Sequence, residues 1–273
     1  MIQPRPDFSS HLPRVATGVC LAAIVAFMLY FRGLPLLFFV LGVTAVSLWE
    51  FYSLFWGRKG RVLTRMCAIL LGWGMLCFTW MRRPQDALVF LGAGFLLAAL
   101  SFLFRWDLGD EQEAFAPGGL FLTGLAYIPL LLLPTTYLSS PKLVLVICCV
   151  AVSDIAAYYI GTHYGQHRLW PRVSPNKSVE GALGSMVACT LVCTALGIAL
   201  GKAPWWAFML LGIVLNIFAQ LGDLFESALK RSCNCKDSGV LLPGHGGVLD
   251  RIDSLLFSLP VFAVVDQWFP FFR

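Results

Sequence analysis

Long apolar runs separated by short polar segments constrain this chain more than any other feature. An α-helix needs about 20 residues to cross the hydrocarbon core of a bilayer, and about nine runs reach or approach that length. They lie near residues 15–31, 34–56, 66–81, 87–104, 118–138, 142–160, 182–200, 204–229 and 254–270. Only 13% of the 273 residues are charged, whereas soluble domains carry roughly 25%. The sequence therefore predicts an all-α, polytopic helical bundle in a membrane.

The basic residues predict how these spans are oriented. Fourteen of the 20 lysines and arginines belong to the N-terminal segment or to the ends and loops that follow even-numbered runs. Because cytoplasmic loops are enriched in Lys and Arg, we expect the N-terminus in the cytoplasm and the C-terminus outside. No small-residue cleavage site follows the first run, which we interpret as a retained span rather than a signal peptide.

Charged residues concentrate between Gly222 and Asp253, where five acids and four strong cations stand close together. Charges at this density beside a bilayer are costly unless they face water, a metal or a charged substrate. We therefore expect residues 111–273 to form the catalytic region, with cytoplasmic loops at 161–181 and 230–253. Residues 1–110 are expected to form the N-terminal transmembrane helices, on hydropathy alone.

One face of the helix predicted over 204–229 is polar and leads to its cytoplasmic end. Five polar side chains fall within an arc of about 80° on an α-helix: Asn216, Gln220, Asp223, Ser227 and Lys230. Hydrogen bonds between membrane helices explain the two amides. They do not explain a carboxylate followed two turns later by a cation, so we favour a functional role for Asp223.

A glycine-rich turn, Pro-Gly-His-Gly-Gly at 243–247, precedes the last run. Glycines there let backbone N–H groups approach an anion closely. Asp250 and Asp253 follow on one helix face, where acids also serve as ordinary N-terminal caps. Together with Asp223, Asp250 offers the carboxylates that Mg²⁺ takes along with water and phosphate oxygens. Such a site holds one cation, or a pair about 3.5–4 Å apart.

Two more polar features precede this stretch. The segment 174–181 reads Ser-Pro-Asn-Lys-Ser-Val-Glu-Gly, and we favour phosphate or nucleotide binding there over a simple helix cap. Asp154 lies inside the run 142–160, where an ionisable group is a functional candidate. We interpret His163 and His167 as interfacial loop residues rather than metal ligands. The sequence has no GxxxxGK[ST] motif, so a P-loop mechanism is not supported.

From Ser227 onward the residues form one long pattern, Ser227-x₂-Lys230-Arg231-x₄-Lys236-Asp237-x-Gly239-x₂-Leu242-Pro243-x-His245-Gly246-Gly247-x₂-Asp250-Arg251-x-Asp253. This pattern resembles the signature of the phosphatidate cytidylyltransferases, also called CDP-diacylglycerol synthases. Gly222-Asp223-x₂-Glu226 and Asp154-x₂-Ala157-Tyr158 are similar to that family as well. So is the segment 174–181, except that Asn176 stands where the family usually has a second lysine. The resemblance covers the C-terminal half.

The resemblance implies a reaction in which CTP and phosphatidic acid give CDP-diacylglycerol and pyrophosphate with the help of Mg²⁺. It also implies a homodimer with a polar cavity open to the cytoplasm, in the bacterial inner membrane. We expect contacts with membrane lipids and no nucleic-acid partner. In the family, the acids that match Asp223 and Asp250 hold the metal site.

Both substrates are polyanions, so we expect positioning and charge neutralisation to carry most of the catalysis. The metal, Mg²⁺ with room for a second cation, is assigned to Asp223 and Asp250. The predicted catalytic residues are Ser227, Lys230, Arg231, Lys236, Asp237 and His245. The predicted substrate-binding residues are Asp154, Ser174, Lys177, Ser178, Glu180, Gly246, Gly247, Arg251 and Asp253.

Three other functions stay open at this point. A cytidylyltransferase acting on another lipid phosphate would keep all of this chemistry. A membrane transporter would use the intramembrane acids to bind substrate and ions, although the acids cluster at one membrane edge and no internal repeat is visible. A CDP-alcohol phosphotransferase would need a D-G-x₂-A-R…G-x₃-D-x₃-D pattern, which the sequence lacks.

Overall fold

The fold is a bundle of long α-helices with one small β-hairpin. The computed structural model describes residues 11–57, 60–109, 115–241 and 246–272. The helices within these ranges are α1 (His11–Phe31), α2 (Gly33–Trp56), α3 (Val62–Trp80), α4 (Asp86–Asp107), α5 (Ala116–Tyr127), α6 (Pro129–Leu132), α7 (Pro134–Tyr137), α8 (Ser140–Tyr164), α9 (Val179–Leu200), α10 (Trp205–Ser232) and α11 (Leu249–Trp268). The strands are β1 (Arg168–Trp170) and β2 (Ser174–Ser178). The all-α membrane prediction is confirmed, apart from this hairpin.

In the part of the chain that the structure describes, seven helical segments are long and apolar enough to cross a membrane. They are α2, α3, α4, Ala116–Tyr137, α8, α9 and α10. The other two predicted spans correspond to α1, whose apolar part is the shorter Thr17–Phe31, and to α11. Three acids, Asp250, Asp253 and Asp266, make α11 more polar than the rest.

The span Ala116–Tyr137 is broken into α5, α6 and α7. Pro129 and Pro134 each stand at the first position of a new helical piece. Proline lacks the N–H that an uninterrupted helix would need there, so each ring ends one piece and begins the next. The sequence prediction of kinks or ends at these prolines is therefore confirmed.

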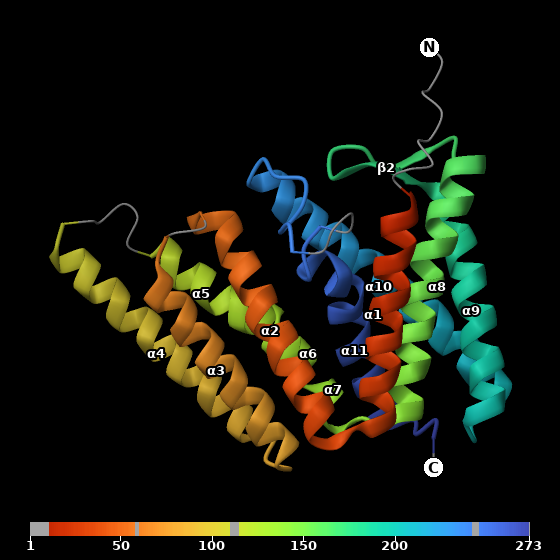
Figure 1. Ribbon diagram of the computed structural model, residues 1–273, viewed down its shortest axis with the longest axis horizontal. Helices are drawn as coiled ribbons and strands as arrows, with labels where there is room; N and C mark the ends of the chain where they lie inside the picture. Colours follow the sequence, from red (N-terminus) through yellow and green to blue (C-terminus); the bar gives the residue numbers. More distant parts are fainter. Residues whose placement is uncertain (1–10, 58–59, 110–114, 242–245, 273) are drawn as a thin grey trace.

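The helices form two groups (Figure 1). Helices α2 to α5 lie tilted in one group, and α8 to α11 form the other, with α1 alongside them. Within the second group α8 packs along α9, α9 along α10 and α10 along α11. Helix α11 also contacts α2, α6 and α7, so it joins the two groups.

A glycine lets α10 and α11 meet closely where the polar residues begin. A Cβ atom at Gly222 would lie 2.4 Å from the backbone oxygen of Asp253 and 3.1 Å from the Cα atom of Ser254. Small residues permit such backbone contact between membrane helices. The contact brings Asp223 and the start of α11 to the same part of the molecule.

The hairpin was not predicted from the sequence. β1 and β2 pair antiparallel, with Arg168 opposite Ser178 and Trp170 opposite Ser174. The prediction also ended the sixth span too early, because α8 continues to Tyr164 and places His163 in its last turn rather than in a loop. A three-residue strand offers too short an alternation of polar and apolar residues to be recognised in sequence.

The hairpin, the end of α10 and the start of α11 all lie at one end of the bundle (Figure 1). At the opposite end, the start of α8 and the end of α11 are joined by Lys142, whose Nζ donates to Asp266 Oδ2 at 2.6 Å. The two polar segments therefore share one end, as the span count predicted. Which side of the membrane that end faces stays a prediction.

Candidate active site

Helix α10 carries a row of charged residues on one face, and neighbouring elements bind to it through ion pairs. Lys177 of β2 places its Nζ 2.6 Å from Asp223 Oδ2. Two turns further along α10, Lys230 Nζ lies 2.6 Å from Asp250 Oδ1 of α11 and 2.5 Å from Glu226 Oε2. Ser227 Oγ donates to Asp223 Oδ1 at 3.2 Å. The structure thus brings the two predicted metal ligands to one face of α10, each paired with a lysine.

Asp250 also fastens the polar segment between α10 and α11. Its Oδ2 accepts hydrogen bonds from the backbone N–H of Ser238 at 3.0 Å, from the Ser238 hydroxyl at 3.0 Å and from the N–H of Gly247 at 2.7 Å. Its Oδ1 accepts the Lys230 ammonium. The carboxylate is therefore engaged on both oxygens, which explains how a side chain with 6% exposure remains compatible with charge.

The centre holds more acid than base. The side chain of Glu226 is fully buried and that of Lys230 is 13% exposed, and together with Asp250 they place two carboxylates around one ammonium. The adjoining turns of α10 and α11 add Asp223 and buried Asp253. Desolvated charges of one sign are costly unless a counter-charge is present. Such a site favours cations.

The donor set suits a divalent cation that is shared with a substrate. In the described residues, no three His, Cys, Asp or Glu side chains lie together in a way that could hold a metal ion alone. Mg²⁺ commonly takes only one or two protein carboxylates, with water and phosphate oxygens completing its shell. Asp223, whose side chain is 31% exposed, and Asp250 are carboxylates of this kind.

Asp154 and Asp253 extend the site toward α8. Asp154 lies on α8, which packs against α10 and α11. Asp253 is buried, and its Oδ1 accepts the N–H of Ser254 at 2.7 Å. Three helices thus contribute acids to one centre.

The hairpin residues predicted to bind substrate have partners of their own. Ser178 is buried and caps α9, because its Oγ accepts the N–H of Gly181 at 3.1 Å. Glu180 accepts His167 Nδ1 at 2.7 Å and the backbone N–H of Gln166 at 3.0 Å. Ser174 stands at the start of β2. These contacts hold the hairpin on α9, so that Lys177 reaches α10.

The two amide side chains on the polar face of α10 form hydrogen bonds to neighbouring helices, as the sequence predicted. Asn216 Nδ2 donates to Ser153 Oγ on α8 at 2.8 Å and to Ser185 Oγ on α9 at 3.1 Å. Gln220 Nε2 donates to Ser185 Oγ at 3.1 Å. The structural interpretation of these two residues is confirmed.

The remaining predicted residues lie in or beside the segment that joins α10 to α11. Arg231, Lys236, Asp237 and Arg251 are exposed, and Arg231 donates to the Cys235 carbonyl at 3.3 Å. Gly246 has φ +79°, a conformation that favours glycine, and Gly247 donates to Asp250. His245 lies outside the described residues.

Comparisons with known proteins show the family of the chain. The model of the cytidylyltransferase family matches residues 12–269. The chain belongs to the cytidylyltransferase family.

Two of its relatives match most of the chain. The chain is 32% identical over 262 residues to a phosphatidate cytidylyltransferase of Bacillus subtilis (strain 168), and the match covers 90% of this chain and 94% of that protein. It is 34% identical over 246 residues to one of Brucella suis biovar 1 (strain 1330), covering 89% and 88%. A third, from Staphylococcus saprophyticus, is 44% identical over 117 residues, which are 42% of this chain and 45% of that one.

Sequence reasoning missed a buried acid of the N-terminal half, Glu50 on α2. Its Oε1 accepts the N–H of Val248 at 3.1 Å, and its Oε2 accepts the N–H of Leu249 at 2.8 Å. Glu50 is the only charged residue between Gly33 and Trp56, and a lone acid in a membrane span was the signal that could have found it.

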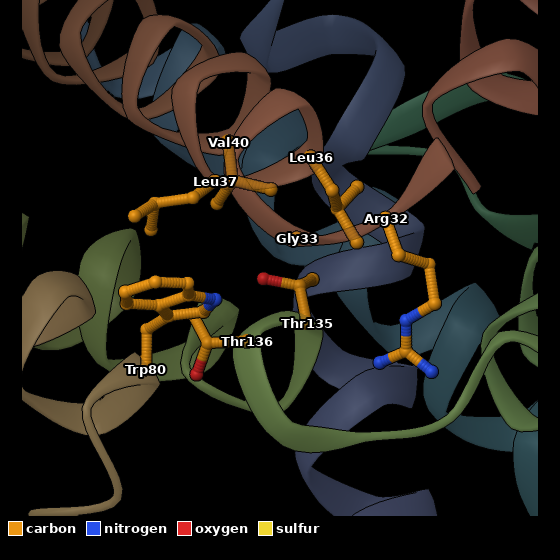
Figure 2. A pocket seen from close by; sticks show the side chains of 8 residues that line it. All are labelled: Arg32, Gly33, Leu36, Leu37, Val40, Trp80, Thr135 and Thr136. Atoms are coloured by element: carbon orange, nitrogen blue, oxygen red, sulfur yellow. The ribbon is translucent and has the colours of Figure 1, made fainter. Parts of the chain in front are cut away.

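A small hollow at the far end of the bundle is too small for a substrate of this family. It has a volume of about 30 Å³ and lies between the start of α2, the end of α3 and α7. Figure 2 shows its lining, with Trp80 beneath Leu37 and Thr135 near the centre. Such a volume holds one or two waters.

Proposed function

We propose that this protein is a phosphatidate cytidylyltransferase, which converts CTP and phosphatidic acid into CDP-diacylglycerol and pyrophosphate. The observation that carries the proposal is the meeting of β2, α10 and α11 through the Lys177–Asp223 and Lys230–Asp250 ion pairs. These residues belong to the sequence patterns that resemble that family. Two relatives that match about nine-tenths of the chain are phosphatidate cytidylyltransferases, which supports the same reaction.

The two lysines account for binding of polyanionic substrates. Lys177 and Lys230 are held by carboxylates before any phosphate arrives. A triphosphate or a lipid phosphate offers the same charge-assisted contacts, so lysines can pass from carboxylate to phosphate oxygens without entering water as bare charges. Exposed Arg231 and Lys236 beside them would add to the attraction of anions.

The reaction needs little covalent help from the protein. An oxygen of the lipid phosphate attacks the α-phosphorus of CTP, a new P–O bond forms, and the bond to the leaving pyrophosphate breaks. The attacking phosphate is already ionised, so no general base is required. Holding the two phosphates in line and neutralising their repulsion then supplies most of the rate enhancement.

Asp223 and Asp250 are the residues that would hold a divalent cation, which we propose to be Mg²⁺ with room for a second cation. Bound there, the cation would neutralise charge on the CTP phosphates. The two carboxylates around the Lys230 ammonium, with Asp223 on the same helix, support this assignment.

We further propose that the charged end faces the cytoplasm at the inner membrane of a bacterium and that the protein is a homodimer. CTP is available on the cytoplasmic side, and phosphatidic acid would arrive within the same leaflet. Size-exclusion chromatography with light scattering in detergent tests the homodimer, and a mass of one chain would refute it.

The decisive experiment supplies purified protein with α-³²P-labelled CTP and defined lipid phosphates in detergent, with and without Mg²⁺. We expect labelled CDP-diacylglycerol and stoichiometric pyrophosphate only when phosphatidic acid and the cation are both present. Labelling of an isoprenoid or ether-lipid phosphate instead would reassign the lipid substrate. Absence of any CTP-dependent pyrophosphate release would reject the reaction and favour a transporter.

A further inference from the structure

Glu50 reaches from the N-terminal half into the segment that carries the candidate catalytic residues. Its side chain binds the backbone N–H groups of Val248 and Leu249 at 3.1 and 2.8 Å, and Ser238 Oγ donates to its Oε2 at 3.4 Å. The residue is only 7% exposed. A buried carboxylate is retained in an apolar helix at a cost, so these hydrogen bonds must offset its desolvation.

Glu50 and Asp250 fasten the same backbone from two sides. Asp250 accepts the N–H groups of Ser238 and Gly247, and Glu50 accepts the next two N–H groups. The single Ser238 hydroxyl proton lies between the two carboxylates, with its oxygen 3.0 Å from Asp250 Oδ2 and 3.4 Å from Glu50 Oε2. Val248 and Leu249 begin α11, where backbone N–H groups have no partner inside the helix. Glu50 therefore caps α11 from a different helix, and its negative charge suits that end of the helix dipole.

Two glycines leave the space that the Glu50 carboxylate occupies. A Cβ atom at Gly239 would lie 2.3 Å from Glu50 Oε1, and one at Gly247 would lie 2.5 Å from Oε2. Both distances are far shorter than van der Waals contact. The chain therefore leaves room for the Glu50 carboxylate at two positions, Gly239 and Gly247.

A cavity lies beside Glu50 and the residues that follow Ser238. The cavity has a volume of about 650 Å³, and its lining includes Trp49 and Glu50 of α2, Ile69 of α3 and residues 238–241. Val240 and Leu241 are exposed. The contacts of Ser238 with Glu50 and Asp250 hold this stretch to α2 and α11.

We propose that Glu50 is a positioning residue for cytidylyl transfer, which holds residues 236–241 and 246–250 in register with α10. This inference rests on the proposed function for its kinetic part. Glu50 acts through Ser238, Val248 and Leu249, and so fixes where Lys236, Asp237 and Asp250 stand relative to Lys230. An error of about 1 Å in such groups can lower turnover on the order of 100-fold.

The test compares Glu50→Gln and Glu50→Ala with a control on the same helix, Gly42→Ala, where an added Cβ would meet no atom within 4 Å. The kcat and the KM for CTP are measured on folded, monodisperse protein, and hydrogen exchange is followed at the amides of Val248 and Leu249. We expect kcat to fall on the order of 10- to 100-fold in the Glu50 variants. We expect exchange at the two amides to accelerate while α9 amides stay unchanged, and Gly42→Ala to behave as wild type.

A second pair of variants tests the contact itself. Gly239→Ala should reproduce the loss, because its methyl group would displace the Glu50 carboxylate. In the double variant Gly239→Ala with Glu50→Ala that collision is gone, so the second substitution should add no more than about a two-fold loss. Additive losses would show that Gly239 and Glu50 act independently.

The outcomes separate the inference from the proposed function. Wild-type protein without cytidylyl transfer would reject the proposed function, and the exchange measurement would still test the role of Glu50. Full turnover in Glu50→Gln, or reduced turnover with unchanged exchange at Val248 and Leu249, would overturn the inference. Faster exchange throughout α9 and α10 would also overturn it, since Glu50 would then support the whole fold.

Discussion

Single residues in this site act as members of charged pairs. Lys177 holds Asp223, and Lys230 lies between Glu226 and Asp250. The pairs keep carboxylates and ammonium groups together near a membrane, where either alone would be costly. Each substitution therefore changes two things, the charge offered to a substrate and the charge left behind on the partner.

Asp223→Asn should lower kcat at least on the order of 100-fold, because it removes a negative charge from the cation site and leaves Lys177 without its carboxylate partner. The amide keeps the size of the side chain, so the protein should still enter the membrane and elute as a monodisperse species. Turnover of labelled CTP measures the effect. Asp107→Asn, at the exposed end of α4, is the matched control. Near-normal turnover in Asp223→Asn would remove the metal assignment.

Lys230→Met should destabilise the protein, because it leaves buried Glu226 and Asp250 without their cation. Loss of one member of a buried ion pair costs about 3–5 kcal/mol. Thermal unfolding in detergent measures this. Adding Glu226→Gln removes one of the stranded charges and should recover part of the stability, while turnover stays low for want of the ammonium. Recovery of both properties in the double variant would contradict a phosphate-binding role for Lys230.

At the scale of elements, the sequence predicted the apolar spans well and the short polar connections poorly. Runs such as 182–200 indicate a membrane span by length and composition alone. The β1–β2 hairpin depends on contacts such as Glu180 with His167, between residues 13 apart, which no local pattern encodes. The Glu50 contact with Leu249 joins residues 199 apart. Asp223 and Lys230 were predicted because helical periodicity places them on one face.

The hairpin offers a prediction that separates a structural from a binding role. Ser178→Ala removes the cap of α9 and should lower stability by about 1 kcal/mol. Because Ser178 is buried against Gly181, we expect the KM for CTP to stay within about two-fold of wild type once the protein is folded. Thermal unfolding and steady-state kinetics measure the two effects. A large rise in KM with unchanged stability would instead support direct substrate contact.

For the whole molecule, two helix groups meet through α11, and the candidate site lies at one end of their junction. Helix α11 packs on α10 and also contacts α2, α6 and α7. Glu50 adds a polar link from α2 to the start of α11. The N-terminal half, where the sequence indicated only hydropathy, therefore contributes directly to the segment that holds Asp250.

The arrangement of α1 to α11 predicts the topology of the chain in the membrane. The start of α1 lies at the same end as the hairpin, and the end of α11 lies at the other (Figure 1). With the basic residues concentrated at the hairpin end, that end should face the cytoplasm.

Alkaline phosphatase fused after Arg273 should therefore be active, since it folds only outside the cytoplasm, and a fluorescent protein fused there should stay dark. The same reporters fused before Met1 are the control and should give the reverse pattern. A fluorescent C-terminal fusion would place the charged end of α10 outside, away from cytoplasmic CTP, and would be incompatible with the proposed reaction.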